Sequence, residues 1–157
     1  MRLTEFRGKD AKTGEWRHGS LINNAFYDHK TKEPIPYIFS PDGGFCFENM
    51  TDDYDVFGVI PETVGQFIGL NDMNGVEIYE GDIISSTAET VLIATGEKTG
   101  KMKTTISVVF WDNINACFST RKKSGYEGRI YGDILIKYNS IIGNIHDNPE
   151  LLETPNA

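Results

Sequence analysis

An Asn-Gly pair, Asn74 and Gly75, constrains the fold of this chain more than any other feature of its sequence. The pair separates two strand-like segments, residues 64–70 and 76–79, which contain β-branched and aromatic side chains. Asn-Gly tolerates the positive φ angles of a type I′ turn, the turn that commonly joins two antiparallel strands. A glycine flanked by two acids at residues 80–82 predicts a second sharp bend. The centre of the chain is therefore predicted to be a β-hairpin followed by a bend.

Short strand-like segments recur along the rest of the chain, with almost no helical periodicity. The other predicted extended segments are residues 3–7, 15–22, 45–47, 56–60, 83–84, 90–95, 104–111, 116–120, 130–138 and 140–146. Residues 27–39 are expected to form a loop with an edge segment, because Pro34 and Pro36 interrupt regular backbone hydrogen bonding. Single helical turns are expected at residues 61–63 and 147–153. The predicted fold class is mainly β: a small barrel or sandwich of short antiparallel strands with a short helical turn or two.

The length and composition suit one folded domain. The chain has 157 residues, of which 39% are hydrophobic and 24% charged, which is enough for a packed core. We predict a single domain over residues 1–157. An alternative with two lobes, residues 1–60 and 61–153, stays open at this point, and residues 154–157 are expected to be a frayed tail.

Several sequence features indicate a cytoplasmic protein. No apolar run approaches the roughly 20 residues of a membrane-spanning helix, and the first residues lack the apolar core of a secretory signal. Two cysteines, Cys46 and Cys117, are too few and too isolated for a disulfide scaffold or a thiolate metal site. We therefore expect free, reduced cysteines, no bound cofactor and no membrane partner.

The distribution of charge divides the chain into three parts. The net charge is −8, and residues 33–97 hold thirteen acidic residues and no Lys or Arg. Residues 1–32 hold seven basic and four acidic residues, and residues 98–157 hold eight and six, so both flanks are mildly positive. These complementary signs can steer a cationic partner or a second copy of the chain. A solvated acidic face is the simpler alternative.

The segment around the Asn-Gly pair invites comparison with a calcium-binding loop. When Gly75 is aligned to the invariant glycine of such a loop, the first ligand position is Leu70 and the twelfth is Gly81. Both positions require an acid in a functional loop. The comparison therefore fails, and a hairpin turn explains the same residues.

Other polar clusters are candidate sites for metal binding or catalysis. Glu77, Glu80 and Asp82 fall within six residues, and such carboxylates can bind a divalent ion or act as acid and base. Strand alternation places Glu77 away from Glu80, however, and a solvated bend accounts for all three. The remaining candidates, none with metal-ligand spacing, are Asp52, Asp53, Asp55, His18, His29 and His146. No catalytic, cofactor or metal residues are predicted.

Six basic residues form the best candidate site for nucleic acid. They fall in two predicted loops, residues 95–103 and 121–125, with Tyr126 nearby to stack against a base. The six are Lys98, Lys101, Lys103, Arg121, Lys122 and Lys123. They would converge only if both loops lay at one end of a barrel. Two solvated hairpin tips are the simpler alternative, and the negative net charge lowers affinity for phosphates.

Three separated blocks of sequence occur together. The blocks are FRG at 6–8 with TGEW at 13–16; TVGQF at 63–67 with GL at 69–70, NG at 74–75 and EIYEGDI at 77–83; and IGNI at 142–145 with NPEL at 148–151. In this order they resemble the YopX family, small proteins encoded by bacteriophages and prophages. The resemblance implies a phage origin, a cytoplasmic location and self-association. It implies no catalytic residues, because the family has no established activity.

Together these features favour a phage or prophage accessory protein that is not an enzyme. We expect it to form a homo-oligomer and to bind a host or phage protein. The alternative, less favoured, is a nucleic-acid-binding module that uses the loops at residues 95–103 and 121–125. An enzyme would require a pocket where acids such as Glu80 and Asp82 converge.

Overall fold

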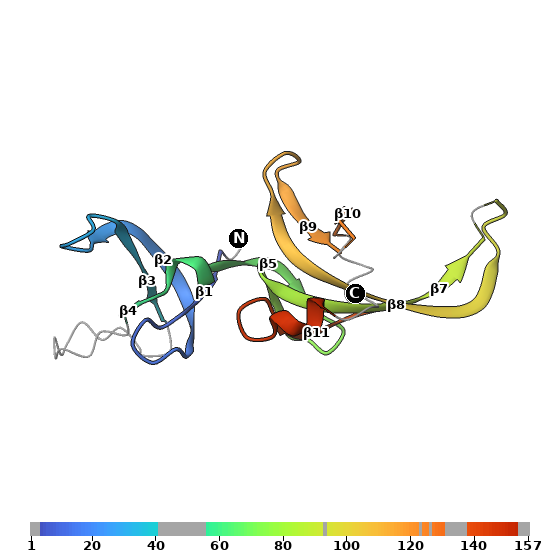
Figure 1. Cartoon of the computed structure of the whole chain (residues 1–157), viewed down its shortest axis with the longest axis horizontal. Helices are drawn as coiled ribbons and strands as arrows, with labels where there is room; N and C mark the ends of the chain where they lie inside the picture. The colour runs from blue at the N-terminus through green and yellow to red at the C-terminus, as the bar shows by residue number, and fades with distance from the viewer. Residues whose placement is uncertain are drawn as a thin grey trace. The chain divides into compact units, whose positions relative to one another are not determined.

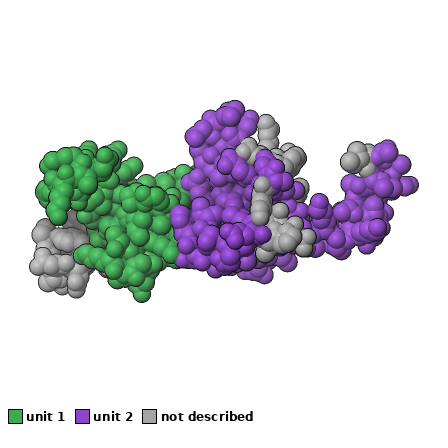
Figure 2. Space-filling model, in the orientation of Figure 1, with its two compact units in different colours: residues 1–67 green, residues 68–157 purple. Residues whose placement is uncertain are grey.

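The computed structural model describes residues 4–40, 56–92, 94–122, 124–125, 127–130 and 138–153 (Figure 1). The described residues form antiparallel strands and two 3-10 turns, η2 (Pro61–Thr63) and η3 (Pro149–Leu152), so the mainly β class and both predicted turns are confirmed. Of the predicted barrel or sandwich, no closed barrel forms among the described residues, because both sheets are open. The chain divides into two compact units, residues 1–67 and 68–157 (Figure 2), whereas the two-lobe alternative placed the boundary after residue 60. No helix in the described residues is long and apolar enough to cross a membrane.

The first unit is an antiparallel sheet with the strand order β4-β3-β2-β1-β5. Its strands are β1 (Phe6–Lys9), β2 (Trp16–Tyr27), β3 (Pro34–Phe39), β4 (Val56–Gly58) and the start of β5 (Gly65–Asn71). The β1 and β2 strands form the predicted first hairpin, in which Phe6 lies opposite Gly19 and Lys9 opposite Trp16. The predicted strand at 45–47 lies outside the described residues.

Residues 28–33 form the loop predicted within residues 27–39, but the following segment is not an edge, because β3 pairs with β2 on one side and β4 on the other. Pro36 is tolerated because of the strand that lies opposite it. The pairing of β2 with β3 is irregular between Ile22 and Phe26, which is the stretch that faces Pro36. A β-bulge of this kind leaves positions at which no ladder hydrogen bond is needed, so the missing N–H of Pro36 costs little. Its carbonyl oxygen still accepts a hydrogen bond from the Val59 amide at 3.0 Å.

The first block of sequence, FRG at 6–8 with TGEW at 13–16, has a structural explanation in this unit. The guanidinium of Arg7 lies 4.7 Å from the centre of the Trp16 ring, and the Lys9 ammonium lies 5.5 Å from it. Asp10 is buried and accepts a hydrogen bond from the Lys12 amide at 2.8 Å. This bond is the main cause that lowers the pKa of Asp10. The block therefore builds a hairpin and its turn.

The second unit contains a five-stranded antiparallel sheet in the order β10-β9-β8-β7-β11. Its strands are β7 (Asp82–Val91), β8 (Lys98–Asp112), β9 (Cys117–Arg121), β10 (Glu127–Arg129) and β11 (Asn139–Asn144). The end of β5 pairs with the short strand β6 (Glu77–Tyr79). The core is formed by Ile68, Ile78, Ile84 and Val109, one residue each from β5, β6, β7 and β8.

The Asn-Gly hairpin is confirmed, but its turn is not of type I′. Gly75 has a φ of 82°, whereas Asn74 is absent from the residues with positive φ, and the Gly75 amide bonds the Asp72 carbonyl at 3.0 Å. This pattern is a type I turn followed by a left-handed glycine. Asp72 is only 3% exposed, and its carboxylate accepts hydrogen bonds from the amides of Asn74, Val76 and Ile141 at 2.8, 3.0 and 3.0 Å. One buried acid therefore holds the turn and ties it to β11.

Candidate functional site

In the second unit, the far half of the β7–β8 hairpin projects beyond its neighbouring strands (Figure 1). On one side, the pairing of β11 with β7 ends at Ser86. On the other side, the pairing of β9 with β8 reaches only as far as Val108. We call residues 87–92 and 94–104 the arm. Among the described residues, the arm pairs only with itself, as in Thr87 opposite Thr104.

Threonine pairs hold the two strands of the arm together. The hydroxyls of Thr87 and Thr104 are 3.0 Å apart, and those of Thr90 and Thr99 are also hydrogen bonded. Glu89 accepts a hydrogen bond from the Gly100 amide at 2.9 Å. Cross-strand threonine pairs stabilise a sheet by roughly 0.2–1 kcal/mol each. The arm is therefore an ordered ribbon made by local interactions.

The arm also exposes apolar side chains. The exposed fractions of Val91, Leu92 and Met102 are 54%, 50% and 64%. An isolated two-stranded ribbon is only marginally stable in water, since neither face is covered. These features are typical of a segment that is covered by a partner.

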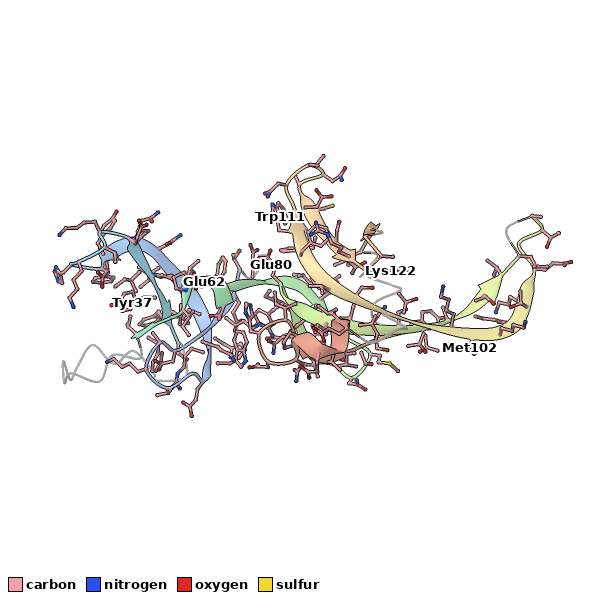
Figure 3. All side chains as sticks on the ribbon, viewed as in Figure 1. Tyr37, Glu62, Glu80, Met102, Trp111 and Lys122 are labelled. Atoms are coloured by element: carbon pink, nitrogen blue, oxygen red, sulfur yellow. The ribbon has the colours of Figure 1, made fainter. Side chains whose placement is uncertain are left out.

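The basic residues predicted to bind nucleic acid do not all lie in two adjacent loops. Lys98, Lys101 and Lys103 lie on β8 within the arm, whereas Arg121 is the last residue of β9. Arg121 pairs with Val108, so about 17 Å of strand separates it from Lys103 and about 33 Å separates it from Lys98. Figure 3 shows Lys122 beside β9, away from Met102 on the arm. Lys123 and Tyr126 are outside the described residues.

The side chain of Arg121 already has a local contact. Its guanidinium lies 4.3 Å from the centre of the Phe110 ring, on the neighbouring strand β8. Such a contact between a cation and an aromatic face fixes the side chain against the sheet. Arg121 therefore contributes to packing at this position.

The three carboxylates of the central block contact three different groups. Glu77 accepts a hydrogen bond from the Tyr79 hydroxyl at 2.9 Å, and Glu80 accepts one from the Trp111 amide at 3.1 Å. Asp82 is 1% exposed and accepts one from the Tyr79 amide at 2.8 Å. Each carboxylate therefore stabilises the bend or its contact with β8.

Other polar groups also have structural partners. Asp112 accepts hydrogen bonds from the Ile114 amide at 2.8 Å and the Asn115 side chain at 2.6 Å. The bond from the Asn115 side chain is the main cause that lowers the pKa of Asp112, against the opposing effect of burial. The described residues contain no group of three or more His, Cys, Asp or Glu side chains placed to hold a metal ion. The cluster of Asp52, Asp53 and Asp55 falls outside them.

Sequence reasoning missed the arm because it placed a loop at residues 95–103. Gly96, Gly100 and three lysines favour a loop, since both residue types are depleted in strands. The signal that indicates a longer hairpin is the series of β-branched threonines on both sides of the turn. The candidate site is thus the arm. It contains Lys98, Lys101 and Lys103, which the sequence had indicated as part of a nucleic-acid site.

The comparisons with known proteins agree with the fold. The crystal structure of protein EF1440 from Enterococcus faecalis matches with a TM-score of 0.51 and 18% sequence identity, covering 97% of this chain and 99% of that one. At this identity the likeness concerns the fold alone. No curated protein matches the chain. The family model described as YopX protein matches residues 5–153, and the chain therefore belongs to the YopX family.

Proposed function

We propose that this protein is a non-enzymatic phage or prophage accessory protein that associates with itself and binds a host or phage protein in the bacterial cytoplasm. The observation that carries the proposal is the arm, an ordered ribbon with exposed Val91, Leu92 and Met102. Membership in the YopX family, for which the resemblance implied a phage or prophage origin, supports the biological setting. The buried carboxylates of Asp72 and Asp82 accept backbone hydrogen bonds, which gives them a structural role.

Self-association predicts a molar mass above that of one chain. We expect light scattering after size-exclusion chromatography to show an oligomer at micromolar protein concentration. If the basic flanks contact the acidic centre between copies, high salt will lower the oligomer fraction, because salt screens exposed charges. A strict monomer at both low and high salt would remove self-association from the proposal. A pull-down from host cells would then test the binding of another protein.

Nucleic-acid binding through Lys98, Lys101, Lys103, Arg121, Lys122 and Lys123 stays a prediction with less support, because the structure places the first three along β8 and Arg121 at the end of β9. Retention of single-stranded nucleic acid at low salt, abolished by replacing Lys122 and Lys123 with Ala, is its test.

A further inference from the structure

The two edges of the arm differ in how well they are protected against pairing with another strand. The β8 edge carries Lys98, Lys101 and Lys103, and lysines on an edge oppose strand addition. It also has an irregularity: between the pairs Glu89–Met102 and Val91–Lys98, β7 advances by two residues and β8 by four. A bulge likewise disrupts an edge. The β7 edge carries no Lys or Arg, so it is the edge available for pairing.

The hydrogen bonds of β11 show which backbone groups of β7 face this edge. Ile141 lies opposite Ile84 on β7, yet its amide donates to Asp72 and points away from β7. Opposed residues in an antiparallel pair point their backbone groups either both toward each other or both away. The groups of Ile84 therefore point toward β8. By alternation along β7, the N–H and C=O groups of Thr87, Glu89 and Val91 point toward the free edge.

The sequence of this edge is compatible with itself in one antiparallel register. Pairing two copies about Thr90 sets Thr90 opposite Thr90, Glu89 opposite Val91 and Ala88 opposite Leu92. The two Glu89–Val91 pairs then exchange four backbone hydrogen bonds, since both residues face the edge. The threonine pair and the apolar pair are both favourable cross-strand neighbours.

The registers shifted toward Thr87 are disfavoured. A register shifted to centre on Glu89 would place two carboxylates directly opposite, which is destabilising. A shift to centre on Ala88 would set Val91 opposite Ser85, whose edge is already occupied by β11. Glu89 itself is compensated within its own arm, since its carboxylate lies 3.3 Å from the Lys98 ammonium.

We propose that the β7 edge of the arm, residues 88–92, pairs with the same edge of a second copy of this chain in an antiparallel two-fold dimer centred on Thr90. The inference rests on the proposed function, whose self-association it assigns to a defined edge. A two-fold contact of this kind uses the unprotected edge of both copies and leaves only the lysine-protected β8 edges outside. The arm then gains the partner that an isolated ribbon lacks.

The first test removes the amide that the pairing needs. Val91→Pro deletes an N–H that faces the edge and leaves the bonds to β8 in place, while the matched control Val91→Ala keeps the amide and shortens the side chain. Two of the four interchain hydrogen bonds are lost in Val91→Pro. At about 1 kcal/mol for each lost hydrogen bond, we expect the dissociation constant of the dimer to rise about 30-fold. Sedimentation velocity over a concentration series measures it.

The second test reads the register directly. In a background with Cys46→Ser and Cys117→Ser, Thr90→Cys places two thiols across the two-fold axis. Cα atoms of such a non-hydrogen-bonded pair are about 4.5 Å apart, within the range of a disulfide. We expect oxidation to link two copies through Cys at 90, and Met102→Cys on β8 to link none.

The outcomes separate this inference from the proposed function. Loss of the oligomer in Val91→Pro, with cross-linking through position 90, supports the β7 edge. An oligomer that persists in Val91→Pro at wild-type affinity, or cross-linking at position 102 and not at 90, overturns the assignment and leaves self-association intact. A wild-type chain that is monomeric at every concentration overturns both.

Discussion

Gly19→Ala is expected to destabilise the first unit by about 3–5 kcal/mol. The added methyl group has no space, and the backbone conformation at this position is unfavourable for a residue with a Cβ atom. Gly19 has a φ of 147°, and a Cβ placed on it would lie 2.0 Å from the Phe39 carbonyl oxygen. That oxygen belongs to β3, which is paired with β2 beside this position. On the other side, Gly19 is paired with Phe6 of β1. β2 therefore cannot shift without breaking its backbone hydrogen bonds to β1 or to β3.

The two tryptophans allow the effect of Gly19→Ala to be measured in its own unit. Trp16 lies in the first unit and Trp111 in the second, and the chain has no other tryptophan. Urea unfolding followed by fluorescence in a Trp111→Phe background therefore reports the first unit. The matched control is Gly14→Ala, since Gly14 has a φ of 75° but no atom within 4 Å of an added Cβ. It should cost about 1–2 kcal/mol from backbone conformation alone. Equal midpoints for the two variants would contradict the steric explanation.

Signals that act over a few residues predicted the elements around the centre correctly. The Asn74–Gly75 hairpin, the bend at Gly81 and the 3-10 turn after Pro61 each depend on the backbone preference of one or two residues. Such preferences are the same in a short segment and in a folded protein. The turn type was predicted wrongly because it also depends on Asp72, whose carboxylate binds the amides within the turn.

Features that depend on distant partners could not be predicted in the same way. Pro34 and Pro36 argued against a central strand, yet β3 accommodates Pro36 opposite an irregularity in β2 that its own segment does not encode. Lys98, Lys101 and Lys103 indicated a loop, yet the arm is held by threonine pairs across the hairpin. The prediction at residues 95–103 therefore had the wrong local structure, because most of this segment belongs to β8. Its unprotected edge becomes visible only when the ends of β11 and β9 are known.

Asp72→Ala is expected to destabilise the second unit by about 2–4 kcal/mol, because a buried carboxylate that bonds three backbone amides is removed. Its bond to the Ile141 amide joins residues 69 positions apart in the chain, so the loss affects the contact between the hairpin and β11. Urea unfolding in a Trp16→Phe background, which leaves Trp111 as the reporter, measures the change. The matched control is Asp112→Ala, since Asp112 lies in the same unit and also accepts two turn amides, but only from Ile114 and Asn115 nearby. A similar loss in both variants would show that the long-range bond is unimportant.

Asp72→Asn separates the turn from the long-range contact. One carboxylate oxygen accepts the amides of Asn74 and Val76, and the other accepts the amide of Ile141. An Asn side chain can keep the first oxygen but presents an NH2 group to the Ile141 amide, so two donors face each other. We expect Asp72→Asn to lose most of the free energy that Asp72→Ala loses. Retention of wild-type stability in Asp72→Asn would assign the effect to the turn instead.

The stability difference between the wild type and Asp72→Asn should also depend on pH. Burial by itself would raise the pKa of Asp72, but the hydrogen bonds from Ile141, Val76 and Asn74 outweigh it and lower the pKa below the ordinary value of 3.8. A lowered folded-state pKa means that the carboxylate contributes its full stabilisation above the ordinary value and loses it as the pH falls toward the folded value. The difference in unfolding free energy should therefore stay constant from neutral pH to mild acid and shrink below pH 3.8. Asp10 and Asp112, whose pKa values are also lowered, are present in both proteins, and their titration cancels in the difference. A difference that shrinks already between neutral pH and mild acid would contradict the role assigned to the Asp72 carboxylate.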